Sequence, residues 1–582
     1  MNPPNSQPSR SRWIAPLLVI VLGAIAYCNS ENGPFIFDDV AAIVRNPQIR
    51  SLNPFRIPPA GPSTIAGRPL LIFSFAANYA VAKLHVQIYH LTNVAIHLIC
   101  ALLLYAIVRQ TLLRKQVWGN RFAGAETWLA AAVAGLWVVH PLNTQAVTFL
   151  AQRAESLAGL FIFAVIFCLI RASAGRRWWW GVAAVVACAC AMLTKETAVA
   201  APILALLYDR AFLAGSFQRA LKLRWKLYAA LAATWLLLLV SIYTGRRGTM
   251  VGFHLGISAT EYARTETNVI ARYVRLAFWP NDLTLDYYDW PIALHWSDIT
   301  WRGRIVMLAI IGWIAALRYR PWLGFLSAWF FLILAPSSSI LPIKMEAIAE
   351  QRMYLPLAAL ICLVVVGAWT IVRRRRWLRI AAQAAWCALA AVLIFLTIQR
   401  NDQFQSVVGM WTDTVSKRPD NPRARFNLGE AYAQESLEFP AGSPEALEAV
   451  HHAKTQFEMV LTLEPQDSDA IFAIGQSLDR AGDPAGAERL YTQSLTKYPE
   501  IAANLLVERG NLRARRQDWN DARQDFLDAI KAQPNDVEPY YFLGILYQAI
   551  GDRAGAIAEF QKAAAIDPKY KDVTARLAKL TR

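Results

Sequence analysis

Apolar runs of about twenty residues, repeated along the first two thirds of the chain, constrain its fold more than any other feature. They begin at Trp13 and end near Ile398. Each has about the length that a helix needs to cross a hydrocarbon core of ~30 Å. From Asn401 onward such runs stop and the chain becomes polar. The sequence therefore predicts an all-α protein with a polytopic transmembrane bundle over residues 1–400 and a second domain over residues 401–582.

The apolar runs give about eleven predicted spans, counted by length and composition. Two further apolar segments, 69–84 and 266–280, are interrupted by charged side chains. We interpret these two as helices that lie at the membrane surface. The predicted spans are 13–28, 88–108, 127–140, 146–170, 178–194, 197–213, 227–243, 304–317, 322–335, 353–371 and 377–398.

Basic residues crowd into short loops between the predicted spans, such as 109–115, 219–226 and 373–379. The positive-inside rule places these loops and the N-terminus in the cytoplasm. The external loops 29–87, 244–303 and 336–352 then face the opposite side. An odd number of spans puts the C-terminal domain there too. The same loops account for much of the formal net charge of +17, so we do not expect nucleic acid as a partner.

The polar C-terminal domain contains an internal repeat. Prolines recur at Pro465, Pro499, Pro534 and Pro568, with spacings of 34, 35 and 34 residues. This is the tetratricopeptide repeat (TPR) period. The sequence predicts four repeats and a terminal capping helix, with about twelve extra residues around 437–448 in the first repeat. The concave surface of such an array binds a polypeptide or a partner protein. A structural cap on the membrane domain is the alternative.

An acidic pair, Asp38 and Asp39, follows the first predicted span by a few residues. A transferase that moves a sugar to a hydroxyl needs a carboxylate as general base. Either aspartate fits that role, or the pair binds a divalent metal ion such as Mg²⁺ or Mn²⁺. A solvated turn is the alternative interpretation of the pair.

Other polar side chains gather at the outer ends of the predicted spans. His90, Asn93 and His97 share one helical face because of their spacing. The Lys and Arg side chains among these polar residues could bind a phosphate group through charge-assisted hydrogen bonds. We predict one polar cavity that opens outward, although each residue alone also fits an interhelical hydrogen bond or a headgroup contact. Its predicted members are His90, Asn93, His97, His140, Arg153, Glu155, Lys195, Glu196, Lys344, Glu350, Arg352 and Tyr354, with Arg153, Lys195, Lys344 and Arg352 as the phosphate-binding cations.

The same residues carry a family resemblance. These motifs occur in the same order as in the transmembrane and tetratricopeptide-repeat-containing O-mannosyltransferases, and together with the repeat tail they resemble that family. The short repeat array, together with Gln145 and Gln152, departs from the family pattern. The motifs are Phe37-Asp38-Asp39 with Asn46-Pro47, Arg68-Pro69-Leu70, Tyr89-His90-Leu91-x-Asn93-x-x-x-His97, His140-Pro141, Arg153-x-Glu155, Lys195-Glu196 and Gln351-Arg352-x-Tyr354-Leu355-Pro356.

The resemblance implies a GT-C glycosyltransferase fold with Asp38 and Asp39 at the catalytic centre. It implies an inverting transfer of a sugar, mannose in eukaryotic members, from a polyprenyl phosphate to a serine or threonine hydroxyl of a protein. It adds Arg68 to the substrate-binding residues. We infer that Arg153 and Arg352 bind the donor phosphate. The short array indicates a bacterial relative in the inner membrane, with its active face and TPR domain in the periplasm.

The sequence leaves three alternative functions. The first is a glycosyltransferase whose acceptor is a lipid or a polysaccharide. The second is a membrane scaffold in envelope assembly that works through its repeats. A transporter is disfavoured, because neither an inverted repeat nor a pair of broken helices is evident.

Overall fold

The computed structural model describes residues 11–53, 65–175, 177–244, 256–338, 346–440 and 442–581. Helices and their connecting turns make up these described residues, and no strand occurs among them. The all-α prediction is confirmed. The chain divides into two compact units, Met1–Asp413 and Thr414–Arg582.

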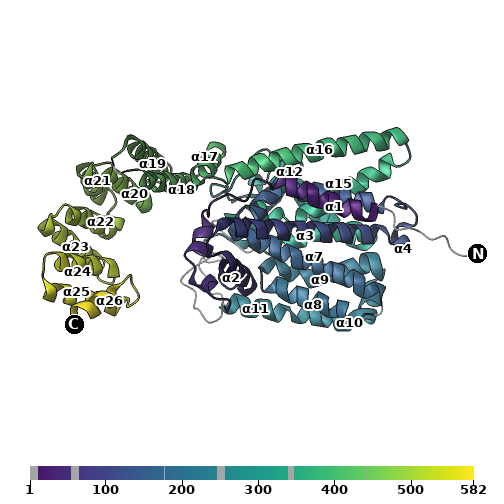
Figure 1. Cartoon of the computed structure of the whole chain (residues 1–582), viewed down its shortest axis with the longest axis horizontal. Coiled ribbons are helices and arrows are strands. Elements are labelled where there is room, and N and C mark those ends of the chain that lie inside the picture. The colour runs from purple at the N-terminus through teal and green to yellow at the C-terminus, as the bar shows by residue number, and fades with distance from the viewer. Residues whose placement is uncertain are drawn as a thin grey trace, which may run out of the picture. The chain divides into compact units, whose positions relative to one another are not determined.

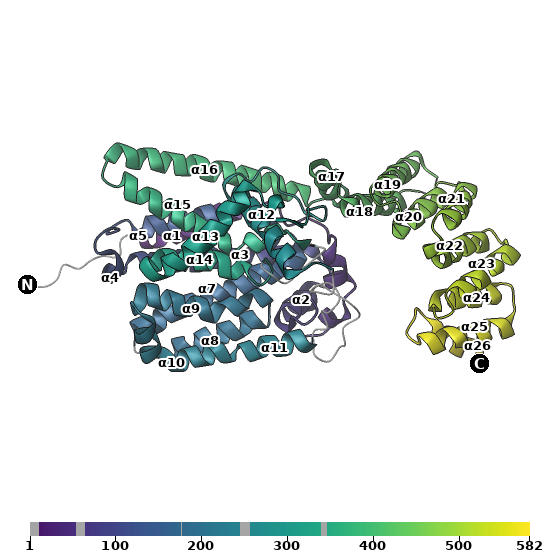
Figure 2. The same cartoon turned by 180° about the vertical axis from the view of Figure 1, so that it is seen from behind.

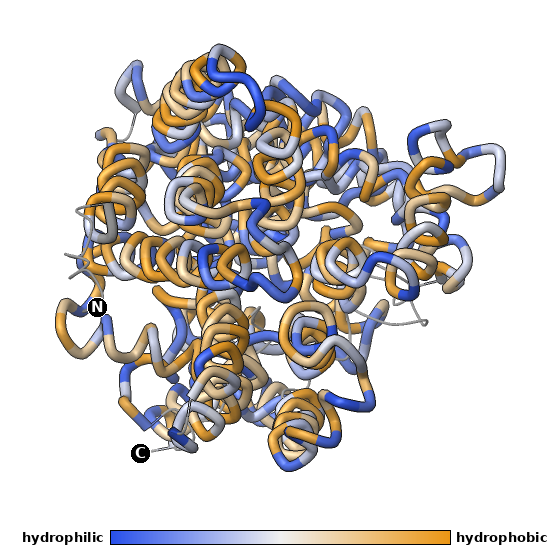
Figure 3. The backbone as a smooth tube through the Cα atoms, turned by 90° about the vertical axis from the view of Figure 1, so that its right-hand side faces the viewer, coloured by the Kyte–Doolittle hydropathy of each residue, from blue (hydrophilic) through white to orange (hydrophobic). Residues whose placement is uncertain are grey.

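The long helices of the first unit run side by side, as both views of the chain show (Figures 1 and 2). Hydrophobic residues prevail along them, and hydrophilic segments lie in turns at the end that faces the viewer in Figure 3. The helices of this unit are α1 (Ser11–Ala26), α2 (Pro69–Ala82), α3 (Val86–Leu112), α4 (Lys115–Trp118), α5 (Glu126–Val138), α6 (Thr144–Val147), α7 (Arg153–Ala174), α8 (Trp179–Met192), α9 (Ala201–Tyr208), α10 (Phe217–Ala233), α11 (Trp235–Thr244), α12 (Ala259–Phe278), α13 (Trp301–Tyr319), α14 (Pro321–Leu334), α15 (Pro356–Val372) and α16 (Arg376–Gln403), and α17 (Val407–Lys417) follows them across the boundary between the units.

Four helical stretches in the described residues are long and apolar enough to cross a membrane, and six shorter apolar helices accompany them. The count of eleven spans stays a prediction, because turns divide several of the apolar runs. The predicted span 146–170, for example, becomes a continuous helix only at Arg153. The four stretches are Val86–Leu112, Leu150–Ala174, Phe217–Tyr243 and Arg376–Gln403.

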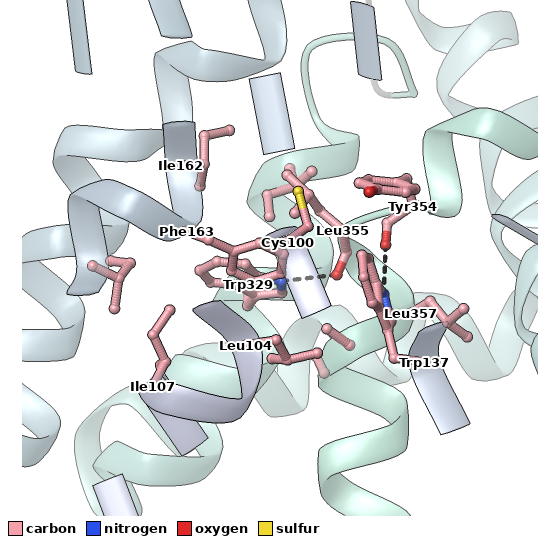
Figure 4. Close-up of a cluster of buried hydrophobic side chains, with 14 of the residues drawn as sticks. Cys100, Leu104, Ile107, Trp137, Ile162, Phe163, Trp329, Tyr354, Leu355 and Leu357 are labelled. Carbon is pink, nitrogen blue, oxygen red and sulfur yellow. Dashed lines mark hydrogen bonds between the residues drawn. The ribbon is translucent and has the colours of Figure 1, made fainter. Parts of the chain in front are cut away.

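Two tryptophans in the core fix the start of α15 (Figure 4). The indole N–H of Trp137 donates to the carbonyl oxygen of Tyr354 at 2.9 Å. That of Trp329 donates to the carbonyl oxygen of Leu355, also at 2.9 Å. An unpaired carbonyl in apolar surroundings costs several kcal/mol, on the order of 2–7. The two bonds therefore hold the chain just before Pro356, where the third external loop rejoins the bundle.

The second unit consists of helix pairs that repeat along the chain, which confirms the predicted helical repeats. The four periodic prolines each lie two residues after the last residue of a second helix, where proline commonly follows a helix end. The first pair is widened by a 20-residue second helix, against 14 residues in the next pair. The helices are α18 (Pro422–Glu435), α19 (Pro444–Leu463), α20 (Ser468–Arg480), α21 (Pro484–Lys497), α22 (Ala502–Arg515), α23 (Trp519–Ala532), α24 (Val537–Ala549), α25 (Arg553–Ile566) and α26 (Val573–Thr581).

A glycine in the first helix of each pair lies against an aromatic ring of the second. A Cβ atom on Gly544 would lie 2.8 Å from the ring of Phe560, so no larger residue fits without displacing it. The close approach recurs in every pair, which is why the repeat needs both residues. The other three contacts are Gly429 with Phe457, Gly475 with Tyr491 and Gly510 with Phe526.

We expect Gly544→Val to lower the stability of the α24–α25 pair by about 1–3 kcal/mol, because the added side chain overpacks the contact with Phe560. Hydrogen exchange of the full-length protein should show faster exchange in that pair. The control Ala549→Val adds a β-branched side chain at an exposed position of the same helix. Equal protection in the two variants would contradict the packing role of Gly544.

Candidate active site

Asp39 anchors the loop after α1 to the turn just before α7. Its side chain is 1% exposed. One carboxylate oxygen accepts the backbone N–H of Ala151 at 2.6 Å, and the other accepts that of Ile36 at 3.1 Å. Burial raises the pKa of Asp39, and the two backbone N–H groups oppose that shift by favouring the charged form. Both oxygens of Asp39 are therefore held by the protein itself.

Asp38, the other member of the acidic pair, is only partly buried and lies near a group of charged side chains. Burial lowers the pKa of Arg68, and the carboxylates of Glu155, Glu346 and Asp38 oppose that shift. These four residues are therefore within electrostatic range of one another. With two ion-pair partners they form what we call the charged cluster, which comprises Asp38, Arg68, Glu155, Lys195, Glu196 and Glu346.

Two ion pairs organise the charged cluster. Arg68 pairs with Glu196 at 3.0 Å, and Lys195 pairs with Glu155 at 2.5 Å. Neither cation uses all its donors in the described part of the chain. The Nε of Arg68 is buried without a hydrogen-bond partner, and Lys195 donates to Glu155 alone although an ammonium group has three donors. The spare donors suit an anion that arrives between these side chains.

Glu346 is a cluster member that the sequence analysis missed. Its carboxylate accepts a hydrogen bond from the side-chain amide of Gln351 at 3.0 Å and is nearly half exposed. It raises the pKa of both Arg68 and Lys195 against the effect of their burial. No motif in the sequence marks Glu346, because its proximity to Arg68 depends on the fold of the third external loop.

Arg153 holds three helices together at the same end of the bundle. Its guanidinium is fully buried and donates to the side chains of Asn93 and Asn78 and to the carbonyl oxygen of Tyr89, at 2.5, 2.6 and 3.0 Å. It also lies over the ring of Phe75, 4.4 Å from the centroid. These contacts join α2, α3 and α7. The predicted contact of Arg153 with a donor phosphate remains a prediction.

His97 and Tyr354, 257 positions apart, meet inside the bundle. Nδ1 of His97 lies 2.9 Å from the hydroxyl of Tyr354, and Nε2 lies 3.0 Å from the carbonyl oxygen of Val138. Only a ring N–H can donate to the carbonyl, so Nδ1 accepts from Tyr354. Both side chains are almost fully buried, at 0% and 1% exposure. The pair packs α3 against the start of α15 rather than facing the charged cluster.

Four other predicted residues also bind backbone groups. Nε2 of His90 lies 2.9 Å from the carbonyl oxygen of Gly33, and Nε2 of His140 lies 3.0 Å from that of Ala277. The remaining two lie beside the third external loop. Glu350 accepts the backbone N–H of Thr284 and the hydroxyl of Tyr287, and Arg352 donates to the carbonyl oxygens of Ser337, Glu346 and Ala347.

The structure thus brings together five of the predicted residues, namely Asp38, Arg68, Glu155, Lys195 and Glu196, and places Arg352 3.8 Å from Glu346 at the edge of the cluster. Contacts inside the protein occupy most of the others. Lys344 lies outside the described residues. Within the described ranges, no group of three or more His, Cys, Asp or Glu side chains could hold a metal ion. Since both oxygens of Asp39 are bound by backbone N–H groups, we derive no step through a metal at the acidic pair.

Glu266, in α12, is a buried carboxyl that no sequence motif marks. It is 2% exposed, and the hydroxyls of Tyr262 and Ser338 lie near its carboxyl group without forming hydrogen bonds of normal geometry to it. Burial raises the pKa of Glu266 to about 8, and the charge of Arg352 opposes that shift. The raised pKa therefore favours a protonated, neutral Glu266 side chain at neutral pH.

The fold and the site define a helical protein with apolar helices of membrane-spanning length, a charged cluster at one end of the bundle and a TPR array. A tetratricopeptide repeat model matches residues 507–571. Protein O-mannosyl-transferase TMTC3 is 22% identical in both Mus musculus and Homo sapiens, over 96% of this chain and 65% of each relative. Protein O-mannosyl-transferase F38B6.6 of Caenorhabditis elegans is 24% identical, over 74% of this chain and 61% of the relative.

These relatives confirm the resemblance to the O-mannosyltransferases. The chain spans less than two thirds of their length. Among solved structures, the crystal structure of MamA is 16% identical and covers 28% of this chain, with 87% of its own length aligned and a TM-score of 0.22. The crystal structure of YrrB, a TPR protein with an unusual peptide-binding site, is 17% identical and covers 30% of this chain, with 81% of its own length aligned and the same TM-score.

We expect Asp39→Asn to lower the free energy of unfolding by about 1–3 kcal/mol, because the amide NH₂ replaces one acceptor and leaves a backbone N–H buried without a partner. Thermal unfolding of the full-length protein in detergent measures the loss. Asp38→Asn, at a partly exposed position, should change the stability less. A larger loss in Asp38→Asn would contradict the anchoring role of Asp39.

We expect the stability of the protein to fall between about pH 4.5 and 8 because of Glu266. In this window the unfolded chain carries the ionised carboxyl and the folded chain the neutral one, since the pKa rises from 4.5 to about 8 on folding. The effect amounts to at most about 1.4 kcal/mol per pH unit and ends above pH 8.

Glu266→Gln removes this titration, so the variant should gain stability relative to wild type as the pH rises from 5 to 8. Thermal unfolding midpoints of both proteins across that range provide the test. Glu31→Gln, at an exposed position, is the control and should follow wild type. Parallel curves for wild type and Glu266→Gln would show that Glu266 is ionised in the folded protein at neutral pH.

Proposed function

We propose that the chain is a membrane glycosyltransferase that moves a sugar from a polyprenyl-phosphate donor to a serine or threonine hydroxyl of a protein. Mannose is the proposed sugar, by analogy with the names of the relatives. The observation that carries the proposal is the charged cluster. In it a partly exposed carboxylate, Asp38, lies within electrostatic range of Arg68, Arg68 lies within range of Lys195, and both cations have spare donors.

In the proposed reaction, Arg68 and Lys195 hold the phosphate of the donor through their spare N–H groups. Asp38 takes the proton of the acceptor hydroxyl, and that oxygen attacks the anomeric carbon. The bond between the anomeric carbon and the phosphate oxygen breaks, and the polyprenyl phosphate leaves with the electron pair. A single displacement inverts the anomeric centre. The cations stabilise the charge that grows on the leaving phosphate.

Asp39 acts in this proposal as a positioning residue rather than as the base. Its two oxygens are committed to backbone N–H groups, and the Ala151 bond ties Asp38 to the segment that also contains Glu155. A base held in place by its neighbour loses little conformational freedom on binding the acceptor, which favours the reaction.

The same proposal includes the arrangement in the membrane. The bundle has a GT-C-like fold of about eleven spans, a count that rests on the apolar runs and their lengths. The N-terminus lies in the cytoplasm, and the charged cluster and the TPR unit face the periplasm of a bacterium. The basic short loops support this orientation. The TPR unit presents the polypeptide acceptor, or a partner protein that delivers it.

Sugar transfer by the purified full-length protein tests the proposal. Detergent-solubilised protein is supplied with radiolabelled polyprenyl-phosphate mannose and a membrane-free extract of envelope proteins. Asp38→Asn should reduce transfer about 10²–10⁴-fold, the usual range for loss of a general base. Glu31→Gln, in the same loop and exposed, is the matched control and should retain activity.

The identity of the labelled product distinguishes the proposed function from its alternatives. Label on protein that depends on Asp38 supports the proposal, and label on lipid or polysaccharide would show that the acceptor is not a protein. Full activity in Asp38→Asn would show that Asp38 is not the base. If well-folded wild type transfers none of mannose, glucose, galactose or aminosugars, the scaffold alternative takes the place of the enzyme.

A further inference from the structure

Two adjoining hollow spaces lie at the end of the bundle away from the charged cluster. The helix α3 connects the two ends. Tyr89, which binds Arg153, lies near its start, and Thr111, which lines one of the spaces, lies near its end. The separation along the helix is about 30 Å at 1.5 Å per residue. The helix α4 and the turn between α15 and α16 mark this second end in Figures 1 and 2.

The inner space is an apolar cavity of about 250 Å³ between α3, α14 and α15. Its walls are aliphatic and aromatic, with residues such as Leu104, Phe325 and Val366. The polar groups at its wall are satisfied in part by each other, as in the 2.6 Å hydrogen bond between Thr111 and Tyr208. An apolar cavity of ~150 Å³ already accepts a benzene-sized molecule, so this one has room for a longer hydrocarbon segment.

The outer space is a hollow of about 600 Å³ that opens to solvent between α4, α10 and the α13–α14 turn. Three exposed arginines line it: Arg121, Arg219 and Arg320. None of them forms an ion pair with a described residue. No acidic residue occurs among the described residues that line either space. The hollow therefore has uncompensated positive charge.

The two spaces adjoin at a pair of tryptophans that are in contact with each other. Trp118 and Trp322 line both of them, and their ring centroids lie 6.0 Å apart. Arg121 lines both spaces as well, so a cation stands where the polar hollow gives way to the apolar cavity. Tryptophan favours such boundaries because its ring is apolar and its N–H is polar.

We propose that this end of the bundle is a binding site for one anionic phospholipid, separate from the charged cluster. The phosphate of the headgroup lies among Arg121, Arg219 and Arg320. One acyl chain passes beside the Trp118–Trp322 pair into the apolar cavity. Charge complementarity selects an anionic headgroup, and the cavity selects an acyl chain over a free phosphate.

The test is lipid binding to the full-length protein, delipidated in detergent and titrated with phosphatidylglycerol, by native mass spectrometry. The variant Arg121→Ala/Arg219→Ala/Arg320→Ala should bind it about 100-fold more weakly, at roughly fivefold for each arginine near an anionic headgroup. The control Arg374→Ala/Arg375→Ala/Arg379→Ala removes the same charge from exposed positions at the turn between α15 and α16, which line neither space. It should retain binding.

A second variant tests the acyl chain without touching the charges. Gly367 lines the cavity, and a Cβ atom there would meet nothing within 4 Å, so we expect the ring of Gly367→Phe to occupy part of the cavity. It should lose the tightly bound phosphatidylglycerol. An excess of inorganic phosphate should not displace the lipid from wild type, because phosphate lacks the chain.

Equal weakening in the two arginine triples would overturn the site in favour of general surface charge. Unchanged binding in Gly367→Phe would show that the acyl chain does not lie in the cavity. Equal affinity of wild type for phosphatidylcholine would show that the site does not select anionic headgroups. Displacement by phosphate would make the hollow a phosphate site only. If the arginine triple fails to fold, Gly367→Phe still decides. The sugar-transfer activity of Gly367→Phe is expected to persist, so failure here is distinct from failure of the proposed function.

Discussion

The end of the bundle that contains the charged cluster depends on one short segment around the start of α7, where successive buried residues each bind a different element. The backbone N–H of Ala151 holds Asp39 of the loop after α1, Arg153 holds α2 and α3, and Glu155 pairs with Lys195. A fully buried guanidinium is costly unless its donors are paired, and breaking such a set costs about 3–5 kcal/mol. The three contacts are therefore coupled through one rigid helix end.

Burial separates the polar residues of this end into two kinds. Side chains with almost no exposure, such as Asp39, Arg153 and His97, form hydrogen bonds with backbone groups or with other buried side chains. Their polar groups therefore stabilise the fold. Asp38 keeps partial exposure and Lys195 keeps spare donors, which is why the proposed function assigns the chemistry to them. Burial thus distinguishes two adjacent aspartates that neither composition nor spacing distinguishes.

The parts of the fold that the sequence predicts are those with a repeating sequence pattern. The spacing of the prolines predicts the helix pairs, and the lengths of the apolar runs predict membrane-length helices, because both patterns repeat locally. Short motifs predict that polar residues gather, yet they say nothing about which groups they bind. The His97–Tyr354 contact joins positions 257 apart. Glu346 and Glu266 carry no motif, since their importance arises from burial and neighbours that exist only after folding.

The two ends of the bundle differ in the kind of electrostatic interaction they offer. The charged cluster contains four carboxylates and two cations, and Arg352 lies 3.8 Å from Glu346 as a third nearby cation, so opposite charges are close to balanced there. In the proposed reaction, short hydrogen bonds from Arg68 and Lys195 would bind the phosphate, while the carboxylates would favour positive charge on a sugar ring at the transition state. Weak ground-state attraction combined with transition-state stabilisation raises the rate of turnover. The arginine-lined hollow at the other end has the opposite design, because an uncompensated positive field suits retention of an anionic lipid rather than its release.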